Sequence, residues 1–108
     1  MVSKETLKIE DVRFRDYELT LIISPEVTEE KFDATVDSII QFITEKGGTV
    51  SDIERWGKRK LAYPIEHFAE GSYVLARFKL GPEFGNELET NLQISEEVLR
   101  YLLIRVNS

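Results

Sequence analysis

Apolar residues recur at two spacings along this chain of 108 residues, and each spacing predicts a different kind of element. From Tyr17 to Ile23 every second residue is apolar, which predicts a strand with one buried face that ends at Ser24-Pro25. After Thr28 the spacing changes to three or four residues, which predicts an amphipathic helix. The apolar stripe of this helix consists of Phe32, Val36, Ile39, Ile40 and Ile43.

Residues with known capping preferences mark both ends of this helix. Thr28 is a preferred N-cap, and Glu29 and Glu30 follow it where negative charge stabilises the positive end of the helix dipole. Gly47-Gly48 stands where helices commonly end, because glycine accepts a left-handed backbone. We therefore expect one continuous helix between these two signals.

Two further strands joined by a hairpin are expected after the helix. The first runs from about Thr49 to Ile65 and the second from Gly71 to Leu80, with residues 66–71 as the connecting loop. Gly57 predicts a bulge, and Pro64, which has no N–H to donate, places this long strand at an edge of the sheet. In the second strand two alternating sets face opposite sides: Val74, Ala76, Phe78 and Leu80 on one, and Tyr73, Leu75, Arg77 and Lys79 on the other.

A second helix and a last strand complete the pattern. Gly81-Pro82-Glu83 begins a helix with apolar residues four apart, and Val98 to Val106 is a strand that is apolar on both faces except for Arg100 and Arg105. The order β-α-β-β-α-β with right-handed crossovers predicts an α+β, ferredoxin-like sandwich: a four-stranded antiparallel sheet with two helices on one face. We expect residues 17–106 to form this single domain and residues 1–16 to form a flexible N-terminal extension.

Composition narrows the classes of function. The net charge of −6 argues against indiscriminate binding to nucleic acid or to an anionic membrane. A local basic patch is still allowed, because salt screens charges beyond roughly 10 Å. The chain has no cysteine and no apolar run of the roughly 20 residues that a membrane helix needs, so we expect a cytoplasmic location.

No set of catalytic or metal-binding residues is visible in the sequence. His67 is the only histidine and falls in a short loop without an obvious nucleophile, which is typical of a solvated histidine. There is no cysteine–histidine zinc pattern and no glycine-rich phosphate loop, and Glu26 after the first strand would repel a substrate phosphate. We therefore expect no enzyme, no cofactor and no metal.

The run from Glu54 to Ile65 combines basic and aromatic residues in an otherwise acidic protein. Its cations are Arg55, Lys58, Arg59 and Lys60, and its aromatic residues are Trp56 and Tyr63. Alternation along a strand places Lys58 and Lys60 on one side, and Arg59 with Leu61 and Tyr63 on the other. Such a surface suits RNA or a protein partner. Equally, lysines on an edge strand can simply block aggregation, and the aromatic residues can belong to the core or its rim.

The sheet face without helices offers a second candidate surface. Tyr73, Leu75, Arg77 and Lys79 are expected there on a central strand, where some RNA-binding domains of this topology stack bases. The signature of those domains is missing from this strand. This face therefore either binds a protein or simply tolerates a few apolar residues.

Several motifs together resemble the bacterial-type ribosomal protein S6 family of the small subunit. They are Tyr17-Glu18, the run from Gly57 to Ile65, Gly71-x-Tyr73 and Val98-Leu99-Arg100-Tyr101. The resemblance implies a structural ribosomal role that binds the central domain of small-subunit rRNA jointly with ribosomal protein S18. It also implies a monomer when isolated and a heterodimer in the ribosome. The expected location is the cytoplasmic ribosome, and an organelle ribosome is the alternative that the sequence leaves open.

The candidate site residues combine this resemblance with the strand pattern. For RNA contact they are Arg15, Tyr17, Arg55, Lys58, Arg59, Lys60, Arg100 and Arg105, and for partner contact Trp56, Leu61, Tyr63, Tyr73 and Leu75. Glu66 departs from the basic or small polar residue that is common after Ile65 in the family. The alternative is a protein-interaction or small-ligand module that self-associates through its open sheet face.

Overall fold

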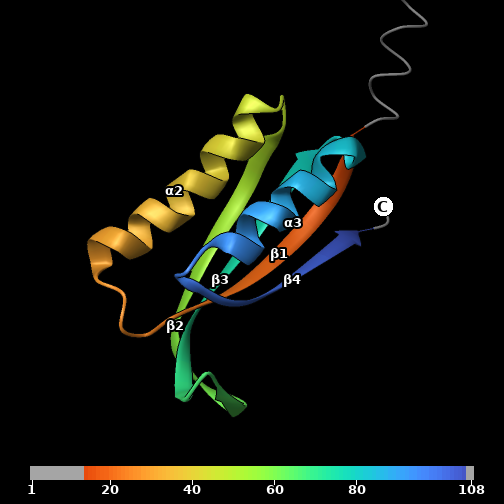
Figure 1. Cartoon of the computed structure of the whole chain (residues 1–108). Coiled ribbons are helices and arrows are strands. Elements are labelled where there is room, and N and C mark those ends of the chain that lie inside the picture. The colour runs from red at the N-terminus through yellow and green to blue at the C-terminus, as the bar shows by residue number, and fades with distance from the viewer. Residues whose placement is uncertain (1–13, 107–108) are drawn as a thin grey trace, which may run out of the picture.

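The computed structural model describes residues 14–106 and contains the predicted order of elements (Figure 1). The predicted extension, residues 1–16, lies mostly outside the described residues, although Arg15 and Asp16 already belong to the first strand. The elements are β1 (Arg15–Ile23), α2 (Glu29–Glu45), β2 (Thr49–Ile65), β3 (Phe68–Leu80), the 3-10 turn η1 (Pro82–Phe84), α3 (Gly85–Ile94) and β4 (Val98–Val106).

The four strands form one antiparallel sheet in the order β2-β3-β1-β4, and both helices cover the same face (Figure 1). The predicted ferredoxin-like α+β fold is therefore confirmed. The long strand β2 lies at one edge, as its proline indicated, and β4 lies at the other. Within the described residues no helix lies over the opposite face of the sheet, which we call the open face.

The core lies between the helices and the sheet and uses the residues that the alternation predicted. Each predicted inward residue of β1 and of β3 is buried, and the stripes of both helices pack onto them. These buried residues are Tyr17, Leu19, Leu21, Ile23, Val36, Ile39, Ile43, Val74, Ala76, Phe78, Leu80, Leu88 and Leu92. Burial of this apolar area is the main stabilising contribution to the fold.

Both ends of α2 have the expected caps. The Thr28 hydroxyl accepts a hydrogen bond from the backbone N–H of Lys31 at 3.2 Å, which satisfies one of the free donors of the first turn. At the other end Gly47 has a φ of +85°, and its N–H donates to the carbonyl of Thr44. The helix ends where the sequence predicted.

The hairpin between β2 and β3 is tighter than predicted. The expected loop of residues 66–71 is wrong, because Ile65 already pairs with Phe68 and only Glu66 and His67 form the turn. Both turn residues have positive φ angles, 47° and 76°, as in the two-residue turns that match the twist of a hairpin. Such turns usually contain Asn or Gly, so Glu-His gave no signal in the sequence.

The bulge predicted at Gly57 is present. The register of β2 against β3 shifts between Arg55 and Gly57, and Gly57 has a φ of +80°. A residue with a Cβ is strained in that conformation, which explains the glycine. The bulge sets the direction of the side chains from Lys58 to Lys60, and a second shift of the register follows between Lys60 and Ile65.

Candidate nucleic-acid and partner interface

The part of the β2–β3 hairpin beyond the bulge carries two different surfaces. Arg59 stands over the ring of Trp56, and Leu61 and Tyr63 line a groove with Tyr73 on the open face. Lys58 and Lys60 pair with Ser72 and Glu70 of β3, which alternate with Tyr73, so they lie on the opposite side of the strand, and both are exposed. The predicted division of the hairpin into these two sets agrees with this geometry.

Trp56 is held by three neighbours. Its indole Nε1 donates a hydrogen bond to Oε1 of Glu54 at 3.0 Å, and its ring is stacked on Tyr73 with centroids 6.4 Å apart and planes 10° from parallel. The guanidinium carbon of Arg59 lies 5.5 Å from the ring centroid, within the range of a cation–π contact. Trp56 therefore supports an arginine on the open face, instead of standing free to stack on a base.

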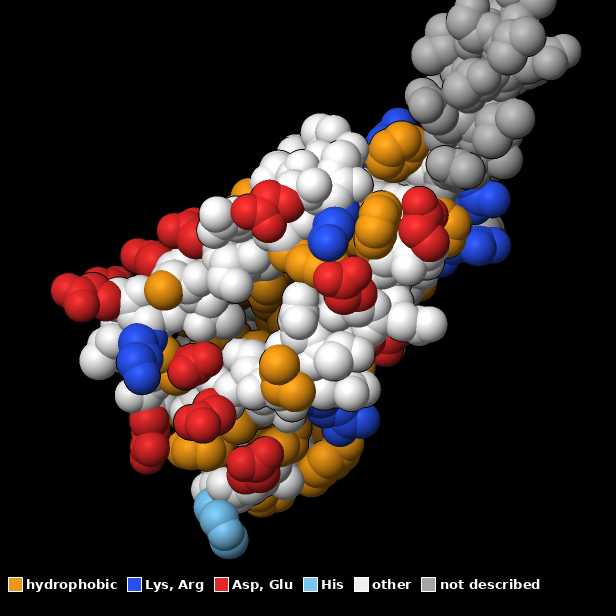
Figure 2. Space-filling model, turned by 45° about the horizontal axis from the view of Figure 1, so that its top comes forward, with side chains coloured by type: hydrophobic (Ala, Val, Ile, Leu, Met, Phe, Trp, Pro, Cys, Tyr) orange, Lys and Arg blue, Asp and Glu red, His pale blue; other side chains and the backbone are white. Residues whose placement is uncertain are grey.

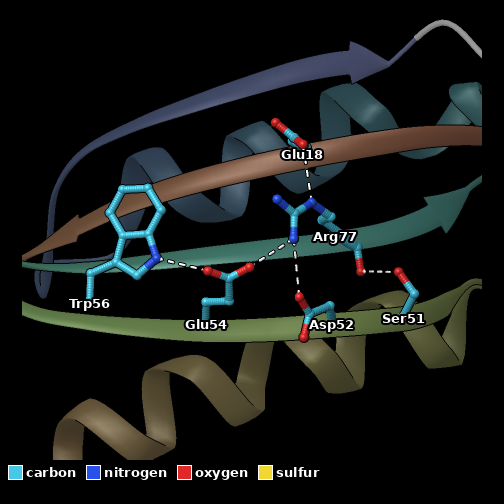
Figure 3. A network of polar contacts seen from close by, with 6 residues as sticks. All are labelled: Glu18, Ser51, Asp52, Glu54, Trp56 and Arg77. Atoms are coloured by element: carbon cyan, nitrogen blue, oxygen red, sulfur yellow. Dashed lines mark hydrogen bonds and ion pairs between the residues drawn. The ribbon is translucent and has the colours of Figure 1, made fainter.

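Arg77 ties three strands together across the open face (Figure 3). Its Nε lies 3.1 Å from Oε2 of Glu18 on β1, and its Nη1 lies 3.1 Å from Oδ2 of Asp52 and 2.8 Å from Oε2 of Glu54 on β2. The hydrogen bonds to Glu54 and then to Glu18 raise the pKa of Arg77, so it stays charged. The hydrogen bond from Trp56, followed by that from Arg77, holds the pKa of Glu54 below its ordinary value of 4.5.

The sequence pattern placed Arg77 on the open face but did not reveal this network. All four charged residues stand at open-face positions of their strands, and Glu18 and Asp52 are both paired with Arg77 in the sheet register. The network could have been predicted only from this register, which the sequence pattern did not specify.

An apolar groove of about 340 Å³ lies on the open face between the hairpin and β4. Arg100 of β4 spans it, since Arg100 donates a hydrogen bond to the Tyr63 hydroxyl and its guanidinium carbon lies 5.8 Å from the Tyr63 ring centroid. Tyr63 is 56% exposed and Leu102 is 57% exposed. The remaining apolar lining is Ile22, Leu61, Ala62, Ile65 and Tyr73, with Thr20 and Tyr101 beside them.

Several predicted site residues lie away from this groove. Arg55 points to the helix side, where its Nη1 pairs with Oδ1 of Asp33 at 2.7 Å and its guanidinium carbon lies 5.2 Å from the Phe32 ring centroid. Arg15 and Arg105 lie at the far end of the sheet from the hairpin turn, at the start of β1 and the end of β4. The structure therefore brings together Trp56, Arg59, Leu61, Tyr63, Tyr73 and Arg100, but not Arg15, Arg55 or Arg105.

Two predicted contacts are corrected by their burial. Tyr17 is only 8% exposed and stacks on Phe78 at 5.6 Å between centroids, so it is a core residue with little surface to offer to RNA. Leu75 does stand on the open face, but it is only 7% exposed because neighbouring side chains cover it. Both corrections have the same cause, because a residue type and its position along a strand do not reveal how fully neighbours cover it.

The helix side has a different character. Acidic side chains are spread over it, with a hollow between the helices where apolar atoms are visible (Figure 2). This hollow, of about 310 Å³, lies between α2 and α3 and contains none of the predicted site residues. Negative charge repels a phosphate backbone, so the surface of the two helices is less suitable for RNA than the hairpin that extends beyond them (Figure 1).

Residues 14–106 contain neither a candidate metal site nor a candidate membrane-spanning helix. Within that range no group of three or more His, Asp or Glu side chains is arranged to hold a metal ion. None of its helices has the length and apolar character of a membrane span.

Comparison with known proteins gives the family. The model of the family described as ribosomal protein S6 matches residues 16–105. The small ribosomal subunit protein bS6 of Caldanaerobacter subterraneus is 42% identical over 93 residues, which are 86% of this chain and 98% of the relative. The protein of the same name from Dehalococcoides mccartyi is 38% identical over 107 residues, 99% of this chain and 98% of the relative.

A solved structure agrees with this result. The crystal structure of 30S ribosomal protein S6 from Thermotoga maritima superposes with a TM-score of 0.81 at 34% identity, over 86% of this chain and 88% of that one. The prediction that the chain is not an enzyme agrees with these relatives, which are ribosomal proteins. The resemblance read from the motifs is confirmed, and the chain belongs to the ribosomal protein S6 family of the small ribosomal subunit.

Proposed function

We propose that this protein is a structural constituent of the small ribosomal subunit that binds the central domain of small-subunit rRNA jointly with ribosomal protein S18. The observation that carries the proposal is the arrangement of the hairpin, where exposed lysines and an apolar, arginine-framed groove occupy opposite sides of one strand. One side suits a phosphate backbone and the other suits a protein.

The charge of the chain supports joint binding. With 20 acidic residues against 14 Lys and Arg and an acidic helix side, the overall charge of the protein repels phosphates. A basic partner bound beside the hairpin would supply the missing contacts and raise the affinity of the pair above that of either protein alone. The isolated chain would then be a monomer that binds RNA weakly, and its cellular location would be that of the ribosome.

The site residues divide accordingly. We assign phosphate contacts to Lys58 and Lys60, with Arg15 and Arg105 as a separate contact at the far end of the sheet. We assign partner contacts to the residues of the groove. Arg59 and Arg100 are the cations at its edge. Leu61, Tyr63 and Tyr73 are its apolar members, and Trp56, which is stacked on Tyr73, supports Arg59 beside them.

A gel-shift titration of central-domain rRNA tests the proposal. We expect weak binding by this protein alone and a shift at least tenfold lower in concentration when S18 is present, since linked binding commonly gains roughly 10²–10⁴ in apparent affinity. Equal affinity with and without S18 would overturn joint binding. No affinity under either condition would overturn the RNA-binding role itself.

One observation favours the alternative of self-association. Leu102, Ile104 and Val106 form an exposed apolar row along the open face of β4, and their exposed fractions are 57%, 45% and 38%. Rows of this kind occur at protein interfaces. Sedimentation equilibrium of the isolated protein distinguishes the two, because the proposed function expects a monomer and the alternative expects a dimer.

A further inference from the structure

The network around Arg77 continues into the binding surface through one carboxylate. Glu54 uses Oε2 for Nη1 of Arg77 at 2.8 Å and Oε1 for the indole N–H of Trp56 at 3.0 Å. Because both oxygens are engaged by partners from two different strands, the plane of the carboxylate is fixed at two points. Figure 3 shows the resulting chain of contacts from Glu18 through Arg77 and Glu54 to Trp56.

Trp56 needs such an anchor because of its position in the chain. It falls between Arg55 and Gly57, where the register of the ladder shifts, so regular pairing with β3 does not fix its backbone. The side chain is 41% exposed, so core packing does not hold it either. Its hydrogen bond to Glu54 and its stacking on Tyr73 are what define the direction of the ring.

The ring in turn carries Arg59. This arginine is exposed, and its guanidinium carbon lies 5.5 Å from the centroid of the Trp56 ring. A long cation that is already held in one orientation loses less rotamer freedom when a partner binds, so the binding affinity is higher than for a free arginine.

We propose that Arg77 and Glu54 are positioning residues, which hold Trp56 so that Arg59 is presented in a fixed orientation on the open face. Arg77 contacts the carboxylates of Glu18, Asp52 and Glu54, and Glu54 is the one that also accepts the hydrogen bond from Trp56. The inference rests on the proposed function, because it explains how the free protein already holds Arg59 in the orientation that binding requires.

How firmly the Trp56 side chain is held can be measured by fluorescence in the absence of RNA and of the partner. Trp56 is the single tryptophan of the chain, so its fluorescence reports on this residue alone. We expect Arg77→Gln and Glu54→Gln to increase quenching by neutral acrylamide and to lower the fluorescence anisotropy. Glu18→Gln is the matched control, because it also removes a carboxylate partner of Arg77 but leaves the Arg77–Glu54–Trp56 path intact. Unchanged quenching in both test variants, with native circular dichroism, would overturn the proposal.

A double-mutant cycle then tests whether the path acts through Arg59. We expect Arg77→Gln to weaken joint binding with S18 to rRNA by about three- to tenfold, the effect of freeing one long side chain. In an Arg59→Ala background the same substitution should have no further effect, whereas a general structural role would give additive losses. Additive losses would overturn the proposal. If the wild-type protein does not bind RNA with S18, the proposed function fails, while the quenching series still decides whether Arg77 and Glu54 order Trp56.

Discussion

Arg100 of β4 and Tyr63 of β2 meet across the groove of the open face, although they are 37 positions apart in the chain. The guanidinium donates to the tyrosine hydroxyl, and its carbon lies 5.8 Å from the ring centroid. The strands that carry these residues are the two edges of the sheet. This contact therefore links the hairpin to the last strand and closes the frame of the groove.

The first prediction concerns this contact. Arg100→Ala should weaken joint binding of S18 and rRNA by roughly tenfold, because it removes a charged contact from the frame. Tyr63→Phe keeps the ring and removes only the hydroxyl, so we expect about threefold weaker binding. Since both groups are exposed, the free energy of unfolding should change by less than about 1 kcal/mol in either variant. Titration calorimetry and urea unfolding measure the two quantities, and a large loss of stability without a loss of binding would contradict this role.

The second prediction concerns the lysines of the hairpin. Lys58→Ala and Lys60→Ala should each reduce the slope of log affinity against log salt by about one unit, which is the contribution of one phosphate contact. Lys31→Ala is the control, because Lys31 is an exposed lysine on α2 at the acidic helix side. Binding isotherms between low and high salt give the slopes. An unchanged slope for both hairpin lysines would exclude them from phosphate contact.

The third prediction concerns pH. The pKa of Glu54 is below its ordinary value of 4.5 in the folded protein, so the stabilisation by ionised Glu54 is complete above that value and is lost as the pH falls through the lowered pKa. The emission of Trp56 should therefore stay constant from neutral pH down to 4.5 and change only at lower pH. Loss of the favourable charge should move this transition upward in Arg77→Gln. Asp52 also faces Glu54, so Asp52→Asn is measured in parallel to separate its effect on the pKa of Glu54 from that of Arg77. A wild-type transition at or above 4.5 would contradict the assigned contacts.

The fourth prediction concerns the turn of the hairpin. Glu66 and His67 both have positive φ angles, which cost free energy for residues with a Cβ. The double substitution Glu66→Asn with His67→Gly introduces the pair preferred in such turns and should raise the free energy of unfolding by about 1 kcal/mol. His67→Ala retains the penalty and should give no gain. Urea unfolding measures the difference, and a destabilised double variant would show that the side chains of this turn have another role.

Local patterns in the sequence were sufficient to predict most of the fold. The alternation in β1, the cap at Thr28 and the bulge at Gly57 each depend on a few neighbouring residues, and all three are present. The tight turn at Glu66 was missed because its residues are unusual for positive φ angles. Fold class followed from the order of elements, which that error did not change.

The site was only partly predictable, because it depends on contacts between strands. The division of Lys58 and Arg59 between two faces follows from alternation within one strand. The contacts of Arg77 need the register of three strands, and the burial of Tyr17 and Leu75 needs the positions of their neighbours. Arg55 likewise pairs with Asp33 of α2, and the sequence pattern did not predict that these two elements meet there.

The most direct test of the central claim compares Arg59→Ala with Arg55→Ala in joint binding with S18 to central-domain rRNA. Both variants remove one arginine from β2, but Arg59 lies over Trp56 on the open face and Arg55 is paired with Asp33 on the helix side. We predict that Arg59→Ala weakens joint binding by roughly tenfold or more and that Arg55→Ala changes it by less than about twofold. Equal effects of the two substitutions, or a larger effect of Arg55→Ala, would contradict the assignment of the open face as the partner-binding surface.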